Sequence, residues 1–129
     1  MKLSFSERFF HNFIADDRWR YIASGLVNTI IIALFAVCIG VILGAVIAFI
    51  RTTYDKTGKL KIPNLLCRLY LTVIRGTPAL IQMLIIYYVV FASVDINKTF
   101  VASVAFGINS GAYVAEIFRS GIMSIDRGQ

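Results

Sequence analysis

Residues Asn109-Ser-Gly-Ala-Tyr-Val-Ala-Glu-Ile-Phe-Arg119 place polar side chains inside a run that is otherwise apolar enough to cross a bilayer. Asn109, Tyr113 and Glu116 follow one another at helical spacing, so all three lie on one face of a helix. A carboxylate or a carboxamide at membrane depth is costly unless other polar groups meet it. We therefore expect a membrane-spanning helix with one polar face, which suits a helix that lines a polar path.

The composition of the whole chain also indicates a membrane protein. Of its 129 residues, 58% are hydrophobic and 16% are charged, whereas soluble domains have about a quarter of their residues charged. The net charge of +6 fits basic residues that flank membrane spans, and no basic stretch carries the spaced aromatic residues of a nucleic-acid surface. We expect contact with the lipid bilayer and none with nucleic acid. Cys38 and Cys67 lack metal-ligand spacing, so we expect neither a metal site nor a disulfide.

The hydrophobic runs predict three membrane spans after an amphipathic N-terminal segment. Residues 1–21 alternate aromatic and charged residues at helical spacing and are expected to lie at the membrane surface. Residues 22–129 are expected to form a partial transmembrane domain, with spans at about 26–50, 78–94 and 99–118. A polar loop is expected over 51–61.

The segment ahead of the second span predicts a helix break. Gly76, Thr77 and Pro78 must interrupt any helix that precedes them, because proline lacks a donor and clashes with the previous turn. Before the break, Arg68, Thr72 and Arg75 share one helix face, and we expect Arg75 to anchor the cytoplasmic boundary.

Small residues at spacing four predict close helix packing. Gly40 and Gly44 form one such pair in the first span, and Gly107 and Gly111 form another in the third. These pairs indicate packing and say nothing of function.

The distribution of lysine and arginine predicts the orientation. Residues 51–75 contain six of them, more than any other segment between or beside the spans. Positively charged loops stay in the cytoplasm. We expect the N-terminus outside and the C-terminus in the cytoplasm.

Two stretches then resemble one family. Arg75-Gly-Thr-Pro-Ala-Leu-Ile-Gln82, and Asn109 to Arg119 continuing into Ser124-Ile-Asp-Arg-Gly-Gln129, are similar to permease subunits of polar amino-acid ABC importers of the histidine/glutamine/arginine type. The resemblance implies an all-α membrane protein of the bacterial inner membrane. It would have an N-terminal interfacial helix plus three transmembrane helices of a five-span type I importer core. Family members continue into an E-A-A loop, so we expect this chain to be a piece of a longer permease.

The resemblance also implies a function and partners. The chain would be a transmembrane permease subunit of an ATP-driven importer for a polar amino acid, working by alternating access. Its partners would be ABC ATPase subunits, a second permease subunit (identical or homologous) and an extracytoplasmic amino-acid-binding protein. No glycine-rich phosphate loop is present, so we expect no enzyme activity and no cofactor in this chain, with ATP and magnesium held by the ATPase subunit.

The resemblance places Asn109, Tyr113, Glu116 and Gln82 on the substrate path. For each of these residues, a purely structural role is an open alternative. Glu116 could be an interfacial carboxylate paired with Arg119 one turn on, while Asn109 and Gln82 could hydrogen-bond to neighbouring helices. For the whole chain, the alternative is a small membrane-anchoring or regulatory subunit that only packs against partner helices; a channel would need a charged ring or carbonyl filter that the sequence lacks.

Overall fold

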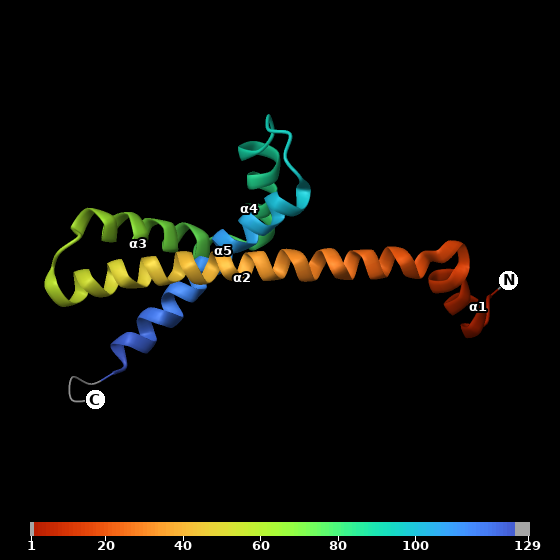
Figure 1. Cartoon of the computed structure of the whole chain (residues 1–129), viewed down its shortest axis with the longest axis horizontal. Helices are drawn as coiled ribbons and strands as arrows, with labels where there is room; N and C mark the ends of the chain where they lie inside the picture. Colours follow the sequence, from red (N-terminus) through yellow and green to blue (C-terminus); the bar gives the residue numbers. More distant parts are fainter. Residues whose placement is uncertain (1, 126–129) are drawn as a thin grey trace. The chain divides into compact units, whose positions relative to one another are not determined.

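The computed structural model describes residues 2–125, and no strand occurs in that range (Figure 1). The expected all-α class is therefore confirmed. Two helical stretches are long and apolar enough to cross a membrane, or three if a pair bent by 110° counts as one broken span. The elements are α1 (Phe5–Phe9), η1 (Phe10–Ile14), η2 (Ala15–Asp17), α2 (Arg18–Thr57), α3 (Lys61–Gly76), α4 (Ala79–Ile85), η3 (Ile86–Val90) and α5 (Lys98–Met123).

The chain divides into two compact units, Met1–Ile31 and Ile32–Gln129. In the first unit, Ser4 and Glu7 form a reciprocal capping box that starts α1. The helical pattern expected over residues 1–21 is interrupted where Asp16 and Asp17 adopt left-handed φ values of 56° and 55°. Aspartate tolerates this conformation better than most residues.

In the second unit, α2 extends further than the sequence predicted. The helix continues to Thr57, so the polar loop expected over 51–61 is wrong except for a short turn around Gly58. Gly58 has a φ of 72°, which only glycine adopts freely, and this ends the helix in the usual way. Arginine, lysine and tyrosine are all compatible with a helix, so the polarity of this segment is not sufficient to predict a loop.

Helices α2 and α5 approach each other closely through glycine. A Cβ added to Gly44 would lie 2.6 Å from Val114 Cγ1, and one added to Gly107 would lie 2.5 Å from Ile39 Cγ2. Neither distance leaves room for a side chain. The close packing expected from the two glycine pairs is confirmed.

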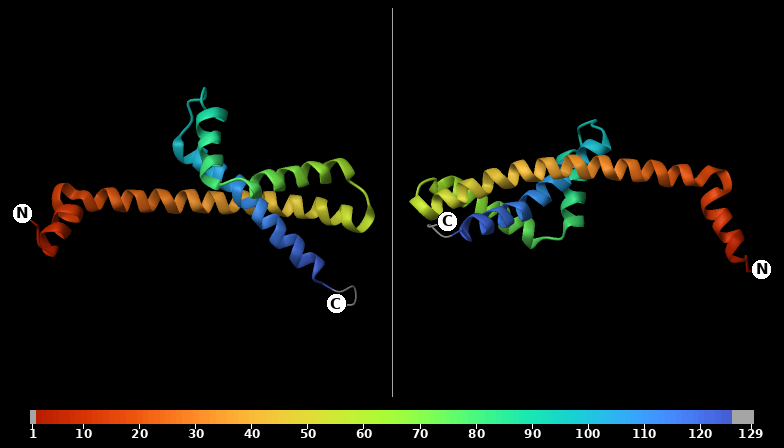
Figure 2. Two further views of the ribbon diagram at one scale, coloured as in Figure 1. Left: turned by 180° about the vertical axis from the view of Figure 1, so that it is seen from behind. Right: turned by 60° about the horizontal axis from the view of Figure 1, so that its bottom comes forward.

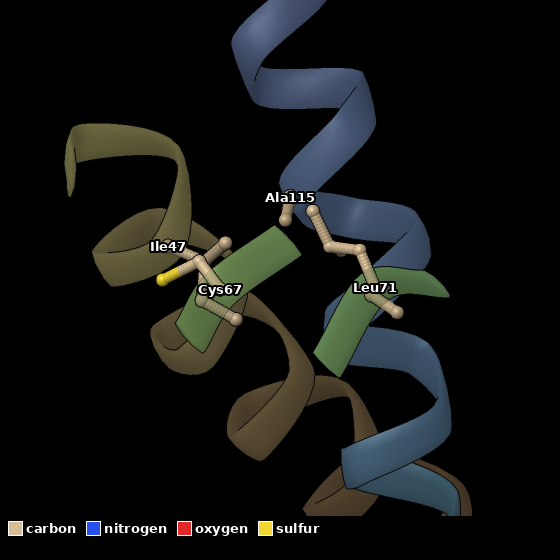
Figure 3. Packing of buried hydrophobic residues seen from close by; sticks show 5 residues of the cluster. Ile47, Cys67, Leu71 and Ala115 are labelled. Carbon is tan, nitrogen blue, oxygen red and sulfur yellow. The ribbon is translucent and has the colours of Figure 1, made fainter. Parts of the chain in front are cut away.

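The core of the second unit lies where α3 packs against α2 and α5. Figure 2 shows α3 running back beside the C-terminal part of α2. Figure 3 shows the apolar side chains that meet there, contributed by all three helices. The Tyr70 hydroxyl also donates a hydrogen bond to the carbonyl of Ile108, which joins α3 to α5. The cluster comprises Ile47, Cys67, Leu71, Ala112 and Ala115.

The second expected span is shorter than predicted. Helix α3 ends at Gly76, α4 begins at Ala79, and helical structure stops at Val90 rather than at residue 94. Residues 79–90 extend about 18 Å, against about 30 Å for the hydrocarbon core of a bilayer. They are long enough for a span only together with α3.

Candidate functional site

Glu116 joins the three helices of the second unit. Its Oε1 lies 2.7 Å from Nη1 of Arg51 on α2 and 3.7 Å from Nη1 of Arg75 on α3. The side chains of Arg51 and Glu116 are 14% and 27% exposed. At this degree of burial a charge needs a partner, and the arginines supply it.

Arg119 has a different partner from the one considered from the sequence. It donates two hydrogen bonds to Oδ2 of Asp55 on α2, at 3.0 and 2.8 Å from Nε and Nη2. The alternative that Glu116 forms a local ion pair with Arg119 is therefore wrong. Two separate ion pairs link α2 to α5, and each carboxylate is bound by an arginine far from it in sequence.

The pocket beside Glu116 is basic. It has a volume of about 230 Å³, and three arginines and one glutamate are among its lining residues. Nε of Arg51 is buried without a hydrogen-bond partner among the described residues. Such a pocket offers donors to an anionic group and one acceptor to a cationic group. It is lined by Arg51, Arg68, Leu71, Thr72, Arg75 and Glu116.

Tyr113 lies at the edge of this charged group. Its ring is 5.9 Å from the guanidinium carbon of Arg75, within range of a cation–π contact, and the residue is 47% exposed. Of the residues expected on the path, Glu116 lines the pocket and Tyr113 contacts a lining residue.

Gln82 occupies the helix break. Its Nε2 lies 2.6 Å from the carbonyl of Ile74, 2.9 Å from that of Thr77 and 2.5 Å from the Thr77 hydroxyl. The last carbonyls of a helix have no partner within it, and here the Gln82 amide supplies donors for them. Gly76, Thr77 and Pro78 thus lie at a 110° bend that a buried side chain stabilises.

Asn109 is bonded to Gln82 and not to the pocket. Its Nδ2 donates to Oε1 of Gln82 at 3.0 Å. This is the helix-to-helix hydrogen bond that was one of the alternatives for both residues. Among the described residues, the lining of the pocket beside Glu116 includes neither of them.

Sequence reasoning did not assign Arg51 or Arg68 to a site. The spacing of Arg68, Thr72 and Arg75 was the available signal, since it placed a polar stripe on one face of α3. Arg51 gave no local signal, because the carboxylate that it binds is 65 residues away.

Comparison with known proteins shows what the chain is similar to. No family model matches the chain. The arginine transport system permease protein ArtQ of Bacillus subtilis is 35% identical over 112 residues, which cover 84% of this chain and 48% of ArtQ. The L-cystine transport system permease protein TcyB of the same organism is 33% identical over 117 residues, covering 90% of this chain and 48% of TcyB. The chain is homologous to permeases of amino-acid ABC transporters.

A solved structure agrees with this homology. The crystal structure of an amino acid ABC transporter with histidines matches 99% of this chain at a TM-score of 0.75 and 34% identity, and the match covers 55% of that chain. The resemblance drawn from the two permease motifs is confirmed. The chain spans about half the length of the curated permeases that it matches. Most of the last motif, Ser124 to Gln129, lies outside the described residues.

The Gln82–Asn109 contact makes a testable prediction for this homologue of the permeases. We expect Gln82→Leu and Asn109→Leu each to destabilise the fold, and the double variant to lose less than the sum, with a coupling of about 0.5–1.5 kcal/mol. Unfolding of purified protein in detergent would measure the free energies. Additive losses would show that the two amides do not depend on each other.

Proposed function

We propose that this chain forms part of the substrate path in the permease subunit of an ATP-driven importer for a polar amino acid. The observation that carries the proposal is the charged pocket where α2, α3 and α5 meet at Glu116. The homology to amino-acid permeases supports it. An amino acid carries an ammonium and a carboxylate, and the pocket contains a group of opposite charge for each.

The energetic task of such a site is modest. A zwitterion that leaves water must exchange its hydration for oriented polar groups, and a few charge-assisted hydrogen bonds suffice. In this proposal Glu116 meets the ammonium, and Tyr113 borders the path. Asn109 and Gln82 shape it by fixing the bend between α3 and α4. Alternating access would expose the pocket to one side of the membrane at a time.

The proposed arrangement in the membrane follows the family. Residues 1–21 would lie at the interface, and residues 22–129 would supply three spans of a five-span type I importer core. The N-terminus would lie outside and the C-terminus in the cytoplasm of a bacterial cell, with the protein in the inner membrane. The basic residues between 51 and 75 support this orientation.

The proposed partners supply ATP hydrolysis, the rest of the substrate path and the delivery of the amino acid. ABC ATPase subunits would bind ATP and magnesium and drive the cycle, so this subunit would not itself be an enzyme. A second permease subunit would complete the path, and an extracytoplasmic binding protein would deliver the amino acid.

The alternative function is a small anchoring or regulatory subunit that only packs against partner helices. One observation favours it: both Gln82 and Asn109 use their side chains for contacts within the protein. The charged pocket argues against it, because helix packing alone does not need a pocket lined by three arginines and one glutamate.

Uptake into proteoliposomes tests the proposal. The complete permease, assembled with its ATPase subunits and binding protein, would be offered radiolabelled L-arginine, L-histidine, L-cystine and L-glutamine. We expect ATP-dependent uptake of at least one of them. An assembled complex whose ATPase is active but which takes up none would contradict the proposed function.

A further inference from the structure

We infer that Gly76, Thr77 and Pro78 form a rigid elbow that Gln82 and Asn109 lock, so that α3, α4 and α5 keep their arrangement while the complete permease changes conformation. The inference rests on the proposed function for the existence of a transport cycle, and it does not depend on which solute is carried. It assigns a conformational role to a break that the sequence predicted only as the interruption of a helix.

The break itself has the features of a hinge. Hinges are a few residues at the ends of helices or strands, and residues 76–78 join α3 to α4 across a bend of 110°. A Cβ added to Gly76 would meet nothing within 4 Å, so packing at this residue does not hold the break. Thr77 and Pro78 have ordinary extended backbone angles, so the bend is unstrained. Contacts from outside the break must therefore decide whether it moves.

Gln82 ties the two helices together across the break. It lies on the first turn of α4, yet its Nε2 is 2.6 Å from the carbonyl of Ile74 on α3 and 2.9 Å from that of Thr77. The two N–H groups of one amide suffice for these two carbonyls. Gln82 is only 8% exposed, so opening the bend would leave its donors and both carbonyls without partners in a buried position. Separation of α3 from the start of α4 is therefore unfavourable.

Helix α5 holds both arms of the elbow at adjacent residues. The Tyr70 hydroxyl on α3 donates a hydrogen bond to the carbonyl of Ile108, and Nδ2 of Asn109 donates one to Oε1 of Gln82 on α4. Leu71, next to Tyr70, belongs to the buried apolar cluster that α3 forms with α5. Because Ile108 and Asn109 are neighbours in one helix, α3 and α4 are bonded to nearly the same point of α5. A change in the angle between α3 and α4 would break at least one of these hydrogen bonds.

The consequence for transport is that this bend neither opens nor closes. Helices α3, α4 and α5 move as one body, and access to the path changes when this body moves against other parts of the complete permease. An unlocked break at glycine and proline would behave differently, because its two halves could move separately.

Pulsed electron paramagnetic resonance of the complete permease, assembled with its ATPase subunits in lipid nanodiscs, tests the elbow. Spin labels would be attached at Leu66→Cys on α3 and Leu84→Cys on α4, two exposed positions, after Cys38→Ser and Cys67→Ala remove the native thiols. The distance between the labels would be compared in the nucleotide-free and the vanadate-trapped states. We expect the same distance distribution in both states.

The two possible failures can be told apart. A shifted distance, or a second population in one of the two states, would overturn the elbow, because the arms would then move relative to each other during the cycle. Absence of uptake in the proteoliposome assay would contradict the proposed function instead. The comparison of states uses no substitution at the elbow, so it does not depend on whether a variant folds.

Variants identify the lock. Gln82→Met keeps the length of the side chain but removes its donors and its acceptor, so we expect a broader distance distribution. Asn109→Leu leaves the bonds from Gln82 to α3 in place and should broaden it less. Ser103→Ala is the matched control, since it removes a buried hydroxyl whose hydrogen bond, to the carbonyl of Thr99, stays within α5. It should keep the wild-type width. Wild-type width in both Gln82→Met and Asn109→Leu, or equal broadening in Ser103→Ala, would overturn the assignment of the lock.

Discussion

Replacing Glu116 with glutamine is expected to reduce amino-acid uptake by the complete importer at least about ten-fold while the subunits still assemble. The substitution removes the carboxylate of the pocket and leaves three arginines in its lining without that negative charge. It also removes the acceptor for the substrate ammonium. The measurement is the initial rate of ATP-dependent uptake, together with ATP hydrolysis stimulated by the amino acid.

The chain offers a matched control for this variant. Asp55 is also a carboxylate bound by an arginine between α2 and α5, and its side chain is 25% exposed against 27% for Glu116. It lies outside the pocket, so Asp55→Asn should cost a similar, modest amount of stability and leave the kinetics of uptake near those of the wild type. If both variants lost uptake equally, Glu116 would be a structural ion-pair partner and nothing more.

The second large effect is expected at Gly44. A Cβ at this position would lie 2.6 Å from Val114 Cγ1 and 2.9 Å from the backbone nitrogen of Ala115. A side chain can change its rotamer, but the backbone of α5 cannot, so Gly44→Ala forces α2 and α5 apart. We expect a loss of about 1–3 kcal/mol in the free energy of unfolding, and more for Gly44→Val.

Gly121→Ala is the control for Gly44→Ala. Gly121 lies on α5, and an added Cβ there meets nothing within 4 Å. Unfolding in detergent should show little loss for Gly121→Ala and a clear loss for Gly44→Ala. Adding Val114→Ala should restore part of that loss, but only part, because the contact with the Ala115 backbone remains. Equal stability of the two alanine variants would contradict the close approach.

Several features of the fold could be predicted because they depend on local chemistry. Glycine pairs at spacing four marked the surface where α2 meets α5, and the apolar run after residue 98 marked α5. The predicted end of the first helix, at about residue 50, was wrong because residues 51–57 are polar, and a polar segment next to a hydrophobic run suggests a loop. A helix continues through polar residues when their backbone bonds are satisfied and no breaker occurs before Gly58.

Less of the candidate site than of the fold could be predicted from the sequence. Glu116 could be singled out from its place on a polar helix face, but its partners could not. Arg51 is 65 residues away, and the nearby Arg119, which suits a local pair, binds Asp55 instead. Pairing across helices depends on how the helices pack, and spacing within one helix does not contain that information. The same holds for Gln82, whose role at the bend follows only from where α3 ends.

The measurement that tests the central claim most directly is an experimental structure of the complete permease with a transported amino acid bound. We expect the amino acid in the pocket between α2, α3 and α5, with its ammonium within hydrogen-bond distance of the Glu116 carboxylate. An amino acid bound elsewhere along the path, with Glu116 still held between Arg51 and Arg75 in every state of the transport cycle, would contradict the claim.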